Sequence, residues 1–203
     1  MLARTLLTLL CVGVAAYALV AYSAFPLGSA VHPDMRAAFE ANRTAIMAHV
    51  FASSVALLLG PLQFLPGLRA RWPAVHRWSG RAYLGIGVLI GGVSGLLMAQ
   101  VAYGGLVGRL GFACLAVAWL LSGVRAYAAI RAGDIGTHQR WMIRNFALSF
   151  AAVTLRLWLP GSVALGVDFD LAYPAIAWLC WIPNLIAAEW LIRRQSARAA
   201  AIA

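Results

Sequence analysis

Two short stretches of the chain repeat one pattern of polar and aromatic residues. The first contains His76 and the second contains His138. Each histidine is followed by an Arg-Trp pair and then by an arginine three residues after the tryptophan, and the spacing differs by one residue. Both stretches lead into long apolar segments. This repetition predicts a duplicated helix pair related by an axis along the membrane normal, in which the two histidines could face one another.

Paired imidazoles at equivalent positions suit the chemistry of haem. Two neutral histidines on facing helices can act as the axial ligands of one haem iron, which gives an electron-transfer site. A helix N-terminus disfavours the protonated ring and so keeps the imidazole available as a ligand. The sequence therefore predicts His76 and His138 as ligands to the iron of haem b. The haem propionates would pair with the nearby arginines Arg77, Arg81, Arg140 and Arg144.

The same residues support two other interpretations. Histidine, arginine and tryptophan near a membrane surface are also typical of an anchoring region that contacts lipid headgroups. A quinone, a lipid or a small anion could also bind there in place of haem. The pattern of residues leaves these alternatives open.

Three polar residues lie inside apolar segments, near the end opposite the paired histidines. His49, Gln100 and Arg156 fall at similar depths and could form a polar cluster. Ionisable groups inside a membrane are costly and are candidates for function by default. Such a cluster would serve as a ligand site or a transport pathway. The structural alternative is that Arg156 extends to the outer headgroups while His49 binds a neighbouring carbonyl.

Two polar residues of the last apolar segment have simpler interpretations. Glu189 lies four residues before Arg193, so an ion pair would neutralise it, although Glu189 could also belong to the transport pathway. Asn184 follows Pro183, which leaves a backbone carbonyl in need of a partner. No hydrolase or nucleotide-binding motif is present, so no catalytic residue is predicted.

The composition shows what kind of scaffold must position these residues. Of the 203 residues, 63% are hydrophobic and 11% are charged, and the mean hydropathy is +0.83. A soluble domain carries about 25% charged residues, so a soluble enzyme is excluded, as are a disordered chain and a disulfide-stapled secreted domain. The net charge of +10 comes from arginines in short gaps between apolar segments, so nucleic acid is not expected as a partner.

Six apolar segments are long enough to cross a bilayer, which requires about 20 residues. The backbone must satisfy its own hydrogen bonds in lipid, so the predicted fold is an all-α bundle of six transmembrane helices in a single domain, 1–203. The duplicated pair would correspond to spans two and three and spans four and five. The first segment is interpreted as an uncleaved span, because its apolar run is longer than that of a signal peptide. The predicted spans are 6–25, 45–65, 82–103, 110–130, 141–159 and 173–192.

The arginines predict how the bundle is oriented. Twelve lie on the side of the N-terminus and three on the other side, while Arg156 lies within a span. Because arginine concentrates in cytoplasmic loops, both termini are predicted to lie in the cytoplasm of a bacterial inner membrane. The twelve are Arg4, Arg69, Arg71, Arg77, Arg81, Arg125, Arg131, Arg140, Arg144, Arg193, Arg194 and Arg198.

Three pieces of the sequence carry a family resemblance. They are HRWSGRAY at 76–83, HQRWMIRN at 138–145 with AVTLR at 152–156, and WIPN at 181–184 with Glu189 and Trp190. These pieces resemble the bacterial predicted membrane proteins of domain of unknown function 2306, over roughly residues 45–194. The resemblance implies a polytopic inner-membrane protein and no particular activity.

The layout also resembles, more weakly, the helical cores of cytochrome b561 and of ferric reductases, which hold haem between histidines of alternating central spans. The third and fifth spans would match one such pair. His49 has no partner histidine on the fourth span, where the repeat places Gly111 or Phe112. The resemblance therefore implies one haem at most, on the cytoplasmic side.

The sequence as a whole favours a haem- or quinone-linked redox protein embedded in the lipid bilayer. One alternative is a small transporter or a lipid- or anion-binding protein that uses His49, Arg156 and Glu189. A second alternative is an assembly partner within a larger membrane complex.

Overall fold

The computed structural model describes residues 2–200 as a bundle of helices joined by short turns. Six helices, some of them interrupted, are long and apolar enough to cross a membrane, and no strand occurs within residues 2–200. The predicted all-α fold with six spans is confirmed. The terminal residues 1 and 201–203 of the predicted domain lie outside the described residues. The elements are α1 (Leu2–Ala24), η1 (Pro33–Met35), α2 (Arg36–Ala41), α3 (Arg43–Gln63), α4 (Pro66–Arg71), α5 (Pro73–Ala82), η2 (Tyr83–Ile90), α6 (Gly91–Ala99), α7 (Gly105–Arg131), α8 (Ile135–Ser149), α9 (Ala151–Ala164), α10 (Phe169–Leu179) and α11 (Ile182–Ala200).

Several spans are longer than the apolar segments that predicted them. The third span begins at Pro73 and the sixth reaches Arg198, whereas the sequence placed these limits at residues 82 and 192. The added turns are polar, because α5 and the last part of α11 continue the helices beyond the apolar core. At about 1.5 Å per residue, such helices span the headgroup regions as well as the hydrocarbon.

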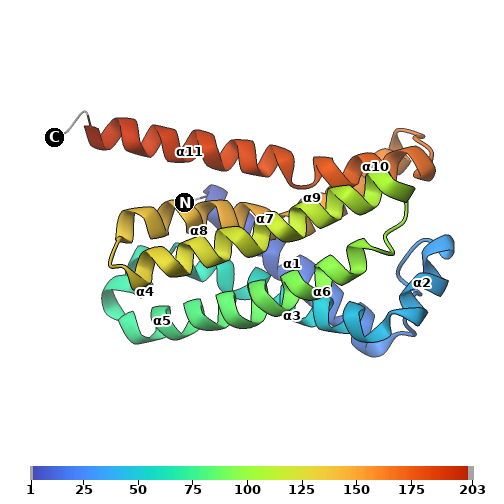
Figure 1. The fold of residues 1–203 in the computed structure, drawn as a ribbon, viewed down its shortest axis with the longest axis horizontal. Coiled ribbons are helices and arrows are strands. Elements are labelled where there is room, and N and C mark those ends of the chain that lie inside the picture. The colour runs from blue at the N-terminus through green and yellow to red at the C-terminus, as the bar shows by residue number, and fades with distance from the viewer. Residues whose placement is uncertain (1, 201–203) are drawn as a thin grey trace.

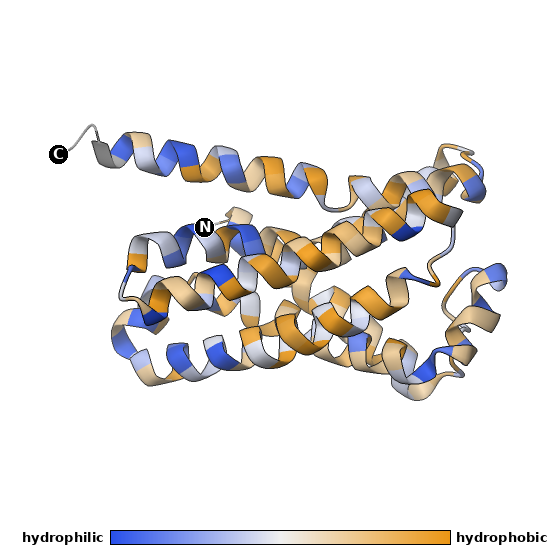
Figure 2. Cartoon of the chain, in the orientation of Figure 1, coloured by the Kyte–Doolittle hydropathy of each residue, from blue (hydrophilic) through white to orange (hydrophobic). Residues whose placement is uncertain are grey.

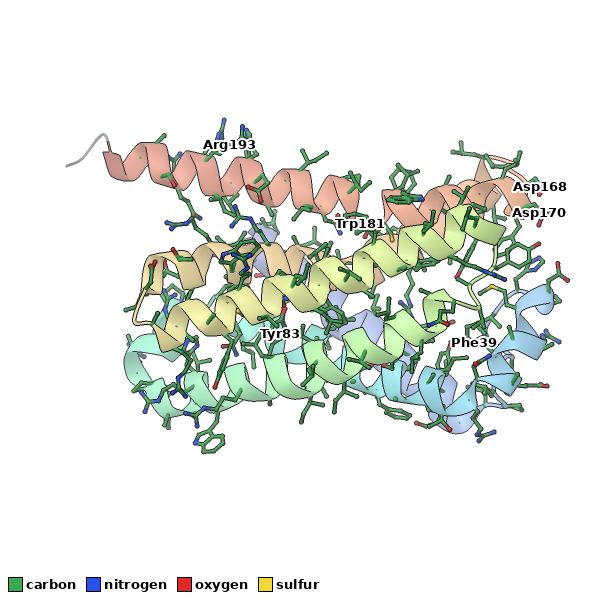
Figure 3. All side chains as sticks on the ribbon, viewed as in Figure 1. Phe39, Tyr83, Asp168, Asp170, Trp181 and Arg193 are labelled. Atoms are coloured by element: carbon green, nitrogen blue, oxygen red, sulfur yellow. The ribbon has the colours of Figure 1, made fainter. Side chains whose placement is uncertain are left out.

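The two ends of the bundle differ in charge. α1 begins and α11 ends at the same end, which also holds α4, α5 and the start of α8 (Figure 1). Hydrophilic residues gather on these elements, and the middle of the bundle is mostly hydrophobic (Figure 2). We call this the arginine-rich end; it carries Arg69, Arg71, Arg77, Arg81, Arg131 and Arg140. The acidic end, opposite, carries Asp34, Glu40, Asp168 and Asp170, of which Figure 3 labels the last two.

Glycines of the third span allow it to pack closely against α3. A Cβ atom added to Gly87 would lie 2.8 Å from the Cβ of Ala56, which is too close for two carbon atoms. A Cβ atom added to Gly95 would lie 2.9 Å from Nδ1 of His49. The third span therefore packs closely against α3 through its glycines, as is common for helices that associate in lipid. One consequence is that His49 sits directly on the backbone of α6.

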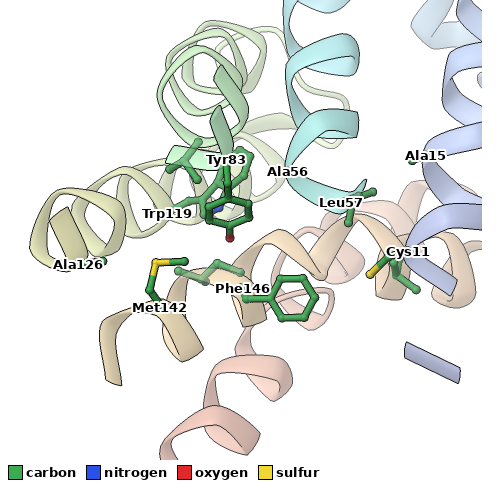
Figure 4. Packing of buried hydrophobic residues seen from close by; sticks show 12 residues of the cluster. Cys11, Ala15, Ala56, Leu57, Tyr83, Trp119, Ala126, Met142 and Phe146 are labelled. Atoms are coloured by element: carbon green, nitrogen blue, oxygen red, sulfur yellow. The ribbon is translucent and has the colours of Figure 1, made fainter. Parts of the chain in front are cut away.

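The third span contains an element that the sequence did not predict. η2 is a π-helical stretch of eight residues between α5 and α6. Such stretches are rare and often occur at functional sites. Tyr83 begins η2, is fully buried, and points toward Met142 and Phe146 of α8 (Figure 4). The π-helix thus places a polar hydroxyl inside an apolar core.

The sixth span is broken between α10 and α11, and proline explains the break. Pro183 has no N–H to donate to the carbonyl of Leu179, so that carbonyl needs another partner. The indole of Trp158 donates to it at 3.2 Å. Asn184 Nδ2 donates to the next carbonyl, that of Cys180, at 2.9 Å. The predicted structural role of Asn184 is confirmed, since side chains satisfy the backbone at this break.

Candidate functional site

The two repeated histidines occupy the same position in their helices. His76 is the fourth residue of α5 and His138 is the fourth residue of α8. Their backbone N–H groups donate to the carbonyls of the capping residues Trp72 and Asp134, at 3.1 and 3.0 Å. The one-residue difference between the two motifs therefore lies after the histidine and does not change where either helix starts.

An acidic cap fixes the beginning of α8. The carboxylate of Asp134 accepts a hydrogen bond from the backbone N–H of Thr137 at 2.8 Å. This bond holds the pKa of Asp134 below its usual value, because it stabilises the ionised form. The cap orients the first turn of α8 and therefore the ring of His138.

A positive charge on the ring of His138 is felt at the ring of His76. Nδ1 of His138 lies 2.8 Å from the carbonyl oxygen of Ala126, on α7. A carbonyl can only accept, so Nδ1 carries a proton, and in the neutral ring Nε2 then has a lone pair. Nδ1 of His76 is buried and has no hydrogen-bond partner among the described residues. Each ring therefore has a nitrogen that could bind a metal or a ligand.

Seven residues after each histidine, the two repeats are joined directly. Tyr83 follows His76 by seven residues and Asn145 follows His138 by seven. The hydroxyl of Tyr83 donates to Oδ1 of Asn145 at 2.7 Å. Residues seven apart lie two turns apart on the same helix face, about 10 Å along the axis. The two histidines therefore stand above the Tyr83–Asn145 bond, on the side of the arginine-rich end.

A buried network of polar side chains surrounds this bond, and the network was not predicted from the sequence. Ser149 Oγ lies 2.9 Å from the Tyr83 hydroxyl and accepts from the indole N–H of Trp119 at 2.8 Å. Asn145 Nδ2 donates to the Trp119 carbonyl at 2.9 Å and to Ser122 Oγ at 2.8 Å. The network connects the third, fourth and fifth spans. The available signal was the seven-residue spacing of Tyr83 and Asn145 from the two histidines.

Three of the predicted propionate partners lie at the surface of the arginine-rich end. Arg77 and Arg81 are exposed, and the guanidinium of Arg81 stacks 4.7 Å from the ring centre of Trp78. Arg140 is also exposed and donates to Oγ1 of Thr137 at 2.7 Å. None of the three is paired with a carboxylate within residues 2–200. Of the three, Arg77 acts electrostatically on His76, and Arg140 acts on the carboxylate of Asp134.

The fourth arginine has a different partner from the one predicted. Arg144 forms a two-pronged ion pair with Glu189 of α11, with N–O distances of 2.5 and 2.9 Å. The predicted ion pair between Glu189 and Arg193 is not formed; Arg193 acts on Glu189 only at longer range. Figure 3 places Arg193 on the side of α11 that faces away from the other helices, whereas Glu189 faces α8. The ion pair ties α11 to α8, so Glu189 is not brought together with His49 or Arg156.

In the other half of the bundle, His49 and Arg156 come together but Gln100 does not join them. His49 interacts electrostatically with Arg156, and its Nδ1 donates to the Gly91 carbonyl at 2.7 Å. Gln100 is exposed at the end of α6. The guanidinium of Arg156 donates to the carbonyl of Ala152 at 2.9 Å, one turn closer to the arginine-rich end. Of the structural alternative, the bond between His49 and a neighbouring carbonyl is confirmed, whereas Arg156 bonds to its own helix and does not extend outward.

At the acidic end, the loops form an aromatic and acidic cluster that the sequence did not reveal. The ring of His32 stacks on Phe169 with centroids 4.0 Å apart. The hydroxyl of Tyr103 donates to the carboxylate of Asp170, which raises the pKa of Tyr103 to about 12, because the bond holds the proton and the anion opposes a second charge. An open pocket of about 440 Å³ lies beside this pair and also contains Arg109.

Comparison with known proteins assigns a family but no activity. Residues 46–192 match the model of the family described as "Predicted membrane protein (DUF2306)", which is more than half of the chain. The chain belongs to the DUF2306 family. No curated protein and no solved structure matches it. Family membership establishes a membrane protein with six apolar helices, and the weaker likeness to cytochrome b561 stays a prediction.

Proposed function

We propose that this DUF2306 protein is a membrane redox protein that holds one haem b between His76 and His138. The observation that carries the proposal is the position of the two rings. They occupy equivalent places on α5 and α8, lie within electrostatic range of each other, and stand two turns above a direct bond between the same two repeats. Two imidazoles from facing helices are a common ligand pair for haem iron.

The side chains at this position fit the ligand role. Histidines that bind a metal through one nitrogen usually donate the other N–H to a carbonyl or carboxylate, and His138 does so to Ala126. The buried Nδ1 of His76 is otherwise unpartnered among the described residues. When bound, haem b supplies a one-electron carrier. The chain's contribution is to hold both rings and to seal the apolar side with the Tyr83–Asn145 network.

The surrounding charges also fit an anionic cofactor. Arg69 and Arg77 interact electrostatically with His76, and neither is paired with a carboxylate within the described residues. They are better placed than Arg144, which Glu189 already neutralises. Because arginine concentrates on the cytoplasmic side, we further propose that this end of the bundle faces the cytoplasm of a bacterial inner membrane.

The test is a spectrum of the purified protein expressed with added haem precursor. The wild-type chain is expected to contain one haem per molecule and to show the sharp reduced bands of a six-coordinate haem. His76→Ala and His138→Ala should each lose that spectrum, whereas His32→Ala, at the acidic end, should keep it. The proposal would be overturned by a colourless wild-type protein. It would also be overturned if His76→Ala and His138→Ala both kept the wild-type spectrum.

A further inference from the structure

Arg156 is a cation inside a transmembrane span, and it has no acidic partner among the described residues. Of the six acidic residues, Glu189 is paired with Arg144, and the other five lie in loops or in short helices and caps at the ends of the bundle. No carboxylate pairs with Arg156 in the part of the chain that the structure describes. A charged group at this depth is costly and is normally paired or functional.

The guanidinium is directed back along α9, away from the acidic end. Side chains of an α-helix lean toward its N-terminus, which for α9 is the direction of the arginine-rich end. Nη1 of Arg156 accordingly donates to the carbonyl of Ala152, one turn back along α9. A headgroup phosphate at the acidic end would therefore have to descend below the position of Arg156 to reach it.

Polar side chains from three other spans converge on this guanidinium. Tyr17 of α1 presents its ring 5.8 Å from the guanidinium carbon. His49 of α3, Tyr22 of α1 and Tyr173 of α10 lie near enough for a charge on any of them to be influenced by Arg156. Arg156 lies eight residues from the end of α9 and Tyr17 seven from the end of α1, so both sit about 10 Å below the acidic end.

The cluster contains no carboxylate within the described residues and holds hydrogen-bond donors, the guanidinium N–H groups and the tyrosine hydroxyls, that are mostly unused, although each hydroxyl can also accept. The guanidinium has five N–H groups, and one bond, to Ala152, accounts for part of them. No hydrogen bond involves the hydroxyls of Tyr17, Tyr22 or Tyr173 within residues 2–200. Such a set of groups is complementary to an anion with two oxygen atoms, because arginine binds carboxylates through two parallel bonds.

We propose that Arg156, with His49 and the three tyrosines, binds a carboxylate within the half of the membrane nearer the acidic end. Tyr17 is 52% exposed and α1 contacts α9, so the cluster can be reached from the outside of the bundle beside these two helices. The carboxylate can come from a fatty acid in the bilayer or from a small organic acid in water. The site is independent of the proposed haem, which lies toward the other end.

Binding can be measured on the full chain in a neutral detergent by titration calorimetry. One arm uses oleate against its neutral amide, and the other uses succinate against succinamide. A carboxylate is expected to bind in one arm, with its amide at least tenfold weaker, since a bond to a charged group is worth about one factor of ten or more. Binding of oleate alone assigns a membrane source, and binding of succinate alone assigns an aqueous one.

The variants separate a binding role from a structural one. Arg156→Gln should abolish carboxylate binding, and Arg156→Lys, which keeps the charge, should retain part of it. The matched control is Arg194→Gln, because Arg194 also stacks on an aromatic ring, at 3.8 Å from Trp190, but on exposed α11. If Arg156→Gln fails to fold, His49→Gln must weaken binding. The proposal is refuted if neither carboxylate binds better than its amide. It is also refuted if Arg156→Gln and His49→Gln bind the carboxylate as tightly as the wild-type protein does.

Discussion

Replacing Asn145 by alanine should destabilise the bundle more than removing any surface amide. The change deletes the acceptor for Tyr83 and the two donors to the Trp119 carbonyl and to Ser122. Side-chain hydrogen bonds in membrane proteins are worth about 0.6 kcal/mol each, so the three contribute about 2 kcal/mol. Asn145 is fully buried, and the cavity that alanine leaves costs about 1 kcal/mol more. The expected loss is therefore about 3 kcal/mol.

The assay is reversible unfolding in mixed detergent, followed by circular dichroism. Asn42→Ala is the matched control, because Asn42 makes one side-chain bond, to the Ala38 carbonyl at 2.9 Å, and is only partly buried. It should lose no more than about 1 kcal/mol. A double-mutant cycle that combines Asn145→Ala with Tyr83→Phe should show a coupling free energy between the two residues. The proposed role of the network would be contradicted if Asn145→Ala and Asn42→Ala lowered the free energy of unfolding equally. It would also be contradicted if positions 145 and 83 showed no coupling.

Further predictions concern helix packing and the two ends of the bundle. Gly87→Leu should prevent stable folding, whereas Gly85→Leu, where a Cβ meets nothing within 4 Å, should be tolerated in a thermal unfolding assay. Asp134→Ala should lower the melting temperature above pH 3.8, and this difference should vanish as the pH falls below the depressed pKa of Asp134, because only the ionised cap stabilises the folded state. Asp170→Asn should lower the pKa of Tyr103 from about 12 toward 10, and a tyrosine that still titrates near 12 in ultraviolet difference spectra would refute the contact.

The six spans could be predicted because the signal lies in local composition. Long apolar runs must form helices in lipid, and the structure contains all six. Their limits could not be predicted as well, because polar turns such as those of α5 continue a helix without an apolar signal. The π-helical stretch that begins at Tyr83 was not predicted either, and it lies where the third span contacts α3.

At the candidate sites, the sequence predicted the position of a residue within its own helix but not its partner on another helix. The matched places of His76 and His138 follow from their motifs, and the Tyr83–Asn145 pair shares the same seven-residue spacing. The partner of Glu189 did not follow, because it depends on which face α11 turns toward α8.

The direction of the Arg156 side chain could have been inferred from sequence. The fifth span runs from the arginine-rich end to the acidic end, and helical side chains lean toward the N-terminus. Arg156 should therefore point back toward the arginine-rich end, in line with its bond to Ala152. The convergence of Tyr17 and Tyr173 on it required the structure, because α1 and α10 are far apart in sequence.

Electron paramagnetic resonance of the oxidised protein, loaded with haem, tests the central claim most directly. If His76 and His138 both bind the iron, the wild-type spectrum is that of a low-spin haem with two imidazole ligands, and each single alanine variant converts it to a high-spin form or loses the haem. A high-spin wild-type spectrum, or a low-spin signal that persists when both histidines are replaced, would contradict the account.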